Sequence, residues 1–100
     1  MQTKDKILSV LKNLKPKYEK EGVVLLGLFG SYAQGRQTDL SDIDIVYRLN
    51  YDKFSKKYAD GFSKLLRLDA IKEDLEKRLK TKVDFLPDKN KIILDEVLYV

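Results

Sequence analysis

The sequence has 100 residues and a formal net charge of +4, from 20 basic and 16 acidic side chains. It contains no cysteine and no histidine. This excludes thiolate nucleophiles, disulfide frameworks, triads that depend on imidazole, and metal sites built on sulfur or imidazole. Any metal must bind to oxygen, which favours hard cations such as Mg²⁺, Mn²⁺ or Ca²⁺.

The length predicts a single domain over residues 1–100. The longest apolar run, Val23–Phe29, is far shorter than the roughly 20 residues of a membrane helix, so we expect no membrane segment. The N-terminal residues mix charge into every turn and do not resemble a secretory signal, which predicts a cytoplasmic protein. Sixteen of the 20 basic residues are scattered lysines, which is typical of solvated helix faces and argues against a nucleic acid partner.

The first predicted element is a helix whose apolar residues recur at helical spacing. These positions are Ile7, Leu11, Leu14 and Tyr18. Thr3 is a candidate N-cap, and Pro16 is expected to end or kink the helix because it lacks a backbone N–H. Gly22 is a plausible stop before the next element.

The middle of the chain predicts two strands separated by a loop. The apolar run 23–29 is typical of a central strand covered on both faces, and residues 43–47 have strand character again. Residues 30–41 are polar and contain glycine, which predicts a loop with room for one short helical turn. The polar stretch 50–61 is ambiguous.

The last third of the chain predicts a long helix and a third strand. The helix covers residues 62–79, and its near-helical apolar stripe is expected to face the core. The stripe consists of Phe62, Leu65, Leu68, Ile71, Leu75 and Leu79. Residues 82–86 predict a short strand closed by Pro87, and residues 91–97 a last short helix or turn. The sequence therefore predicts an α/β (α+β) fold with a small mixed β-sheet flanked by helices.

Three aspartates lie in or beside predicted strands. Asp44 and Asp84 each lie between two apolar strand residues, where a carboxylate is costly unless it is paired or bound to a metal. Asp42 precedes Asp44 by two residues, so both project from one face of a strand. If strand 82–86 pairs beside it, Asp84 can join them, and three carboxylates would repel unless divalent cations neutralise them. An Asp-x-Asp pair alone is better explained structurally, with Asp42 as a cap or turn residue and Asp44 on an exposed strand edge.

The turn that follows the first predicted strand favours a binding site over a purely structural explanation of these aspartates. Gly30 lets the backbone approach a ligand closely, and Ser31 adds a hydroxyl. With the N–H groups of a following helical turn they would form a phosphate cradle. A Gly-Ser pair by itself is more simply a strand-exit turn. Because this pair lies ten residues before Asp42-x-Asp44, the phosphate interpretation is favoured.

These residues carry a family resemblance. Gly30-Ser31, ten residues, then Asp42-Ile43-Asp44 resembles the Gly-Ser-x10-Asp-x-Asp motif of the DNA polymerase β-like nucleotidyltransferase superfamily. The stretch LFGSYAQGRQTDLSDIDIVYRL is similar to the minimal nucleotidyltransferases, and KVDFL, which contains Asp84, matches the third carboxylate strand of the family. The resemblance spans residues 22–86 and implies a polymerase β-like palm. One departure is Gln34, where many relatives carry Arg, which makes Arg36 a candidate phosphate-binding residue.

The resemblance implies nucleotidyl transfer that depends on two Mg²⁺ ions, with Mn²⁺ as an alternative. Asp42 and Asp44 would bind the ions that hold ATP. Asp84 would complete the metal site and help deprotonate an acceptor hydroxyl, and Gly30 and Ser31 would hold the β- and γ-phosphates. Two ions about 3.5–4 Å apart stabilise both the attacking and the leaving oxygen of an in-line displacement.

The resemblance also implies a partner. Minimal family members commonly pair with a HEPN-domain toxin and act as its antitoxin by transferring AMP from ATP to a tyrosine of the toxin. We expect this role. Two alternatives stay open, namely a binding module that neutralises its toxin sterically, and nucleotidyl transfer to a small molecule or an RNA end.

Overall fold

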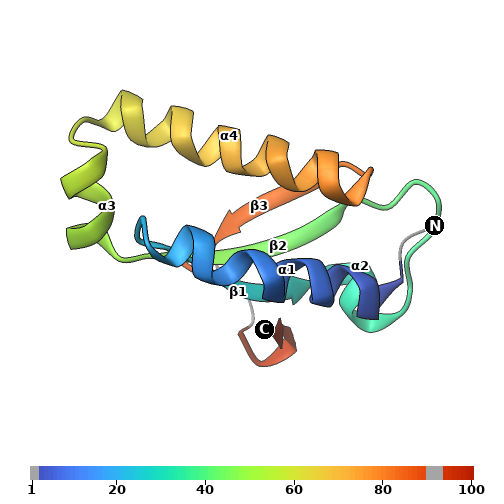
Figure 1. The fold of residues 1–100 in the computed structure, drawn as a ribbon. Helices are drawn as coiled ribbons and strands as arrows, with labels where there is room; N and C mark the ends of the chain where they lie inside the picture. The colour runs from blue at the N-terminus through green and yellow to red at the C-terminus, as the bar shows by residue number, and fades with distance from the viewer. Residues whose placement is uncertain (1–2, 90–93) are drawn as a thin grey trace.

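The computed structural model describes residues 3–89 and 94–100, and it shows helices packed on a four-stranded sheet (Figure 1). The strand order is β3-β2-β1-β4. Strand β2 is antiparallel to β1 and parallel to β3, and β4 is antiparallel to β1. The elements are α1 (Lys4–Glu19), β1 (Val23–Phe29), α2 (Gly30–Gln34), β2 (Ile43–Leu49), α3 (Tyr51–Lys57), α4 (Gly61–Leu79), β3 (Val83–Pro87), η1 (Leu94–Glu96) and β4 (Leu98–Tyr99). The α/β fold with a small mixed sheet is confirmed.

Helix α1 begins as predicted and ends later than predicted. The Thr3 hydroxyl accepts a hydrogen bond from the Lys6 N–H at 3.2 Å, which makes Thr3 the N-cap. The helix continues through Pro16 to Glu19, so Pro16, which was expected to end or kink the helix, does not end it. The last turn carries Tyr18, which is buried and donates its hydroxyl hydrogen to Asp74 of α4. This tertiary packing holds the turn despite the hydrogen bond that proline cannot donate.

Helix α4 differs more from its sequence pattern. Ile71, Leu75 and Leu79 are buried against the sheet as expected. Phe62 and Leu65 are 71% and 68% exposed, so the first two positions of the predicted core stripe are not core, whereas Leu68 packs against it. Helical spacing identifies an apolar face, but the extent of the sheet determines how much of that face is covered.

Several elements were not predicted. The ambiguous stretch 50–61 contains α3, whose N-cap Asn50 accepts a hydrogen bond from the Lys53 N–H at 3.2 Å. The short strand β4 lies beside β1, where a Cβ at Gly27 would overlap the backbone of Leu98. Of the predicted element 91–97, residues 91–93 lie outside the described residues, and 94–96 form η1. No helix in the described ranges 3–89 and 94–100 is long and apolar enough to cross a membrane.

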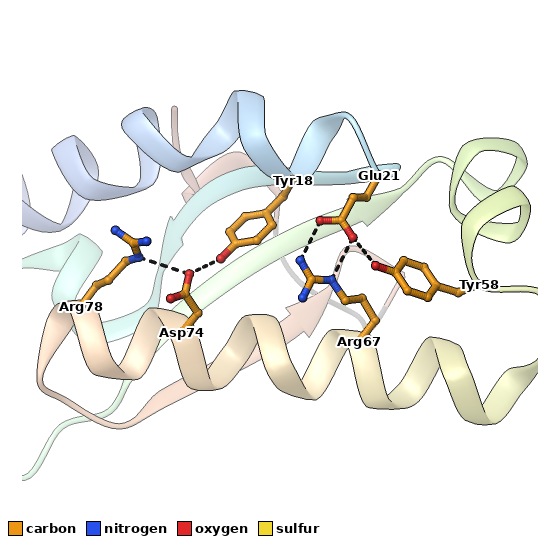
Figure 2. Close-up of polar contacts among 6 residues, drawn as sticks. All are labelled: Tyr18, Glu21, Tyr58, Arg67, Asp74 and Arg78. Atoms are coloured by element: carbon orange, nitrogen blue, oxygen red, sulfur yellow. Dashed lines mark hydrogen bonds and ion pairs between the residues drawn. The ribbon is translucent and has the colours of Figure 1, made fainter.

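Two polar clusters join the helices on one side of the sheet (Figure 2). In the first, Arg67 donates from Nε and Nη2 to the two carboxylate oxygens of Glu21, at 2.8 and 2.7 Å, and the Tyr58 hydroxyl also donates to Glu21. The second cluster consists of Tyr18, Asp74 and Arg78. In both clusters each carboxylate has an arginine and a tyrosine as donors, so these charges are paired.

Candidate functional site

Asp44 and Asp84 lie side by side on neighbouring strands. Strands β2 and β3 are parallel, and their register aligns Asp44 with Asp84. On the other side of β2, Asp44 is aligned with Phe29, the last residue of β1. From the sequence, Asp84 could join the other aspartates only if the third strand pairs beside the second, and in the structure β3 does pair with β2. One end of the sheet therefore brings together Asp44, Asp84 and the turn that begins at Gly30.

The carboxylates lie on the face of the sheet opposite α1 and α4. The core beneath these helices takes its sheet residues from Ile43, Ile45 and Tyr47 of β2. Because side chains alternate along a strand, Asp44 and Val46 project from the other face. There Val46 packs with Val97 in a small apolar cluster. This cluster thus shares the face of the sheet on which the carboxylates lie.

Asp42 is less closely integrated. It is exposed and precedes the first residue of β2, in the loop that the Thr38 N–H stabilises by donating to Ser41 Oγ at 2.9 Å. In the described part of the chain, no three acidic side chains are already gathered closely enough to hold a metal ion. The fold thus brings together two of the three predicted carboxylates, Asp44 and Asp84, and leaves Asp42 exposed in the loop before β2.

The electrostatics of Asp44 are unusual for a surface site. Its pKa is raised from 3.8 to about 6, first by burial and then by the neighbouring Asp84 and the charge of Asp42. Among the described residues, neither the hydrogen bonds nor the ion pairs give Asp44 or Asp84 a basic partner. A half-buried carboxylate beside a second carboxylate, without a basic partner, is suited to bind a cation.

The Gly30-Ser31 turn lies directly against these carboxylates. Gly30 has a φ of +75°, and a Cβ at this position would overlap the carboxylate of Asp44. Gly30 is therefore required both for the left-handed backbone and for the close approach. It also opens α2, whose N-cap Phe29 provides no side-chain hydrogen bond, and Ser31 is only partly exposed. The first turn of α2 thus offers backbone N–H groups beside the carboxylates.

Arg36 lies on the loop just after α2. Its N–H donates to the Ser31 carbonyl at 2.9 Å, and its guanidinium donates to the side-chain oxygen of Gln34. Gln34 in turn donates to Glu96 of η1 at 3.4 Å. The sequence did not reveal this chain of contacts, because it joins exposed residues 62 positions apart and no local pattern records it. Gln34, at the position where many relatives carry Arg, thus holds the Arg36 guanidinium near the Gly30-Ser31 turn.

The donor set fits a hard divalent cation. All candidate ligands are carboxylate oxygens, and two of them, Asp44 and Asp84, are aligned on neighbouring strands. The same set does not fit a soft metal, because the chain has no cysteine or histidine. The arrangement suits chemistry in which a cation and a phosphate meet at the edge of a sheet.

Comparison with known proteins agrees with this geometry. The chain matches the family described as "Nucleotidyltransferase domain" over residues 5–100. Two proteins of Methanocaldococcus jannaschii, each named "putative protein adenylyltransferase", are similar to it over the full length of both chains. They are 36% identical over 111 residues and 32% identical over 108 residues. A third relative with the same kind of name from that organism is 35% identical and covers 80% of this chain and 75% of its own length. No solved structure matches the chain.

Proposed function

The chain belongs to the nucleotidyltransferase domain family and is a nucleotidyltransferase, and we propose that it transfers AMP from ATP to a hydroxyl group of a partner protein. The observation that supports this most strongly is the register of Asp44 and Asp84 beside Gly30. The protein acceptor is supported by the names of the relatives.

The Gly30-Ser31 turn binds the triphosphate. Because Gly30 has no side chain, phosphate oxygens can approach the backbone N–H groups at the start of α2 and the Ser31 hydroxyl. Arg36, anchored to Ser31 through its backbone, adds a positive charge next to the β- and γ-phosphates. Together they hold the pyrophosphate portion as it leaves.

The three aspartates provide the oxygen ligands. Asp42, Asp44 and Asp84 would hold two Mg²⁺ ions, with Mn²⁺ as a substitute, and bound ions of this kind polarise the α-phosphate and lower the pKa of an attacking hydroxyl. Asp84, exposed at the edge of the sheet, accepts the proton of the acceptor hydroxyl. The oxygen of the acceptor then forms a bond to the α-phosphorus, and the bond to pyrophosphate breaks.

The acceptor is a tyrosine of a HEPN-like toxin, and the chain acts as its antitoxin in the cytoplasm. An acceptor on another protein is supported by the names of the relatives, which are called putative protein adenylyltransferases. A tyrosine hydroxyl is a suitable nucleophile because an adjacent carboxylate can remove its proton as the new bond forms.

Transfer of label from ATP tests this function. The chain is incubated with Mg²⁺, the candidate toxin and ATP that is labelled on either the α- or the γ-phosphate. We expect label in the toxin from α-labelled ATP only, located at a tyrosine by mass spectrometry. Label from γ-labelled ATP would indicate phosphorylation and contradict the proposal.

The matched variants separate catalysis from binding. Asp42→Asn with Asp44→Asn should abolish the transfer, whereas Asp39→Asn, an exposed carboxylate of the same loop, should leave it unchanged. Protection of cells by the double variant at the wild-type level would show steric neutralisation instead. Preferential labelling of an RNA end or a small molecule would place the acceptor in another class.

A further inference from the structure

A hollow opens on the helix side of the sheet, at the end where β2 leads into α3 (Figure 1). It is lined by the last residues of β2, the start of α3, Leu68 of α4 and the residues that end and follow β3. Its volume of about 440 Å³ lies within the roughly 300–1,000 Å³ of small-ligand sites. We call it the Tyr47 hollow, after the residue that it shares with the core of the protein.

Tyr47 is a buried side chain with a free polar end. It is 7% exposed, and its ring stacks on that of Phe85 with centroids 4.2 Å apart. The hydroxyls of Tyr18 and Tyr58, on the same side of the sheet, each donate to a carboxylate. Among the described residues, the Tyr47 hydroxyl takes part in no comparable hydrogen bond. Because buried polar groups are almost always paired, a free one indicates a missing partner.

The Tyr47 hydroxyl opens into the hollow. In the part of the chain that the structure describes, the side-chain oxygen that is sealed from solvent without a partner is Gln37 Oε1, so the Tyr47 hydroxyl is open to the space beside it. Burial raises the pKa of Tyr47 above its ordinary value, and the neighbouring Tyr51 and Asp88 raise it further. Both neighbours line the same hollow, which places the hydroxyl there. The hydroxyl stays protonated at neutral pH and can donate a hydrogen bond to an anion.

The charges of the hollow favour an anionic ligand. Arg48 Nε donates to the Asp88 carboxylate at 2.8 Å, so these two charges are paired. Lys89 forms no ion pair with another described residue, and its ammonium lies 5.7 Å from the centroid of the Tyr51 ring. The hollow therefore has an excess of one positive charge, beside a hydroxyl that can donate. An ammonium and a hydroxyl together provide charge-assisted hydrogen bonds to one anionic group.

The remaining walls are apolar and carry rings. Tyr47 and Tyr51 contribute aromatic rings from β2 and α3, Pro87 contributes the ring of its side chain, and Leu68 lies on the side of α4. The Tyr51 ring is accessible to a ligand, because this residue is 56% exposed. Aromatic rings pack on one another in offset or edge-to-face arrangements. These walls thus suit a planar ring better than a flexible polar group.

We propose that the Tyr47 hollow binds a small aromatic anion, with the ring of the ligand between the apolar walls and its anionic group at the Tyr47 hydroxyl and the Lys89 ammonium. The hollow is separate from the candidate nucleotide site. Tyr47 lies on the helix side of β2, whereas Asp44 projects from the opposite face. The inference does not depend on the proposed function, and its failure would leave that proposal intact.

Titration with 2-naphthoate tests the site, with the neutral 2-naphthamide as a matched compound of nearly the same shape. Amide NMR shifts of the isotope-labelled chain report both affinity and location. We expect 2-naphthoate to bind with a Kd of about 1 mM or lower, which is ordinary for a ligand of this size, and the amide to bind at least ~5-fold more weakly. The shifts should centre on Tyr47, Tyr51 and Lys89. Equal binding of the amide, or shifts confined to the exposed Leu65 and Leu66 of α4, would overturn the proposal.

Two variants test the two anchoring groups. Tyr47→Phe keeps the ring that stacks on Phe85 but removes the hydroxyl, and it should weaken 2-naphthoate ~5–10-fold. Lys89→Gln removes the exposed charge and should weaken it ~3–5-fold. Tyr99→Phe and Lys6→Gln, which change residues outside the hollow, are the matched controls and should bind like the wild type. Thermal melting confirms that each variant is folded.

Two outcomes of these titrations would contradict the assignment. Wild-type affinity of Tyr47→Phe would show that the hydroxyl does not hold the anion. Displacement of 2-naphthoate by saturating ATP with Mg²⁺ would place the probe in the nucleotide site on the other face of the sheet. We expect ATP to leave the binding of 2-naphthoate unchanged, because the two sites lie on opposite faces.

Discussion

Glu21, which is buried on the helix side of the sheet, and Asp44, which is half-buried on the opposite face, are carboxylates with opposite surroundings. The Arg67 guanidinium holds the pKa of Glu21 below its ordinary value, with a smaller contribution from the Tyr58 hydroxyl. Burial and the neighbouring Asp84 raise the pKa of Asp44 to about 6. The first carboxylate is paired and stabilises the contact between helices (Figure 2). The second lies beside another carboxylate without a basic partner, an arrangement that costs stability and suits the proposed binding of a cation.

Replacing Asp44 should therefore give the largest change in activity and an unusual change in stability. Asp44→Asn removes a proposed metal ligand, and we expect nucleotidyl transfer to fall by at least ~10²-fold. In metal-free buffer at pH 8 the melting temperature should rise by about 2–8 °C, because the repulsion with Asp84 is removed.

The pH dependence checks the cause of this stabilisation. The folded-state pKa of Asp44 lies above its ordinary value of 3.8, so ionisation disfavours the folded state as the pH rises from about 4 to 6. The gain from Asp44→Asn should be absent at pH 4 and complete above pH 6. Added Mg²⁺ should raise the melting temperature of the wild type but not of the variant. A variant that melts at a lower temperature than the wild type at pH 8 would show that the Asp44 charge does not destabilise the fold.

Gly30→Ala should be the next largest change. The added methyl group would overlap the Asp44 carboxylate at a backbone φ of +75°, which predicts a loss of about 1–3 kcal/mol in the free energy of unfolding. Displacement of Asp44 by about 1 Å would reduce activity ~10²-fold. Gly35→Ala is the matched control, because this residue has a φ of +72° with nothing within 4 Å. Equal loss of activity in both variants would show that backbone strain alone is responsible.

The sequence predicts the part of the site that depends on local spacing. The alternation of strand residues predicted that Asp42 and Asp44 project from one face. Gly30 was predicted to let the backbone approach a ligand, and in the structure the group that lies against it is the Asp44 carboxylate. The long run of strand residues in β1 and the apolar periodicity of α1 were also sufficient to locate these elements. In each case the physical cause lies within a few residues of the chain.

The remaining features depend on contacts between distant residues. The continuation of α1 past Pro16 depends on the burial of Tyr18, and the exposure of Phe62 depends on where the sheet ends. Strand β4 has only two residues and forms because Gly27 lets Leu98 approach the backbone of β1. The alignment of Asp84 with Asp44 likewise depends on which strands pair, which the sequence left open.

Glu21→Gln should give an effect on stability opposite in sign to that of Asp44→Asn. Loss of the charge paired with Arg67 predicts a decrease of about 1–3 kcal/mol in the free energy of unfolding at pH 7. The pKa of Glu21 is lowered from 4.5, so this contribution is complete above that pH and is lost as the pH falls below it. Chemical denaturation at pH 7 and at pH 3 measures the difference, with the exposed Glu73→Gln as control. Catalytic activity at temperatures where the variant is folded should be unchanged.

The smallest effect is expected at Arg36, which belongs to the candidate site but is exposed. Arg36→Ala removes one positive charge beside the phosphates, and we predict a rise in KM for ATP of about 3–10-fold with little change in kcat. Arg36→Lys should restore part of the affinity, because the charge remains although its hydrogen bond to Gln34 is changed. Gln34→Ala should raise KM less than Arg36→Ala does, since it releases the guanidinium without removing its charge. If Arg36→Ala lowers kcat and leaves KM unchanged, the guanidinium acts in the transition state, and the phosphate contacts of the ground state come from the Gly30-Ser31 turn alone.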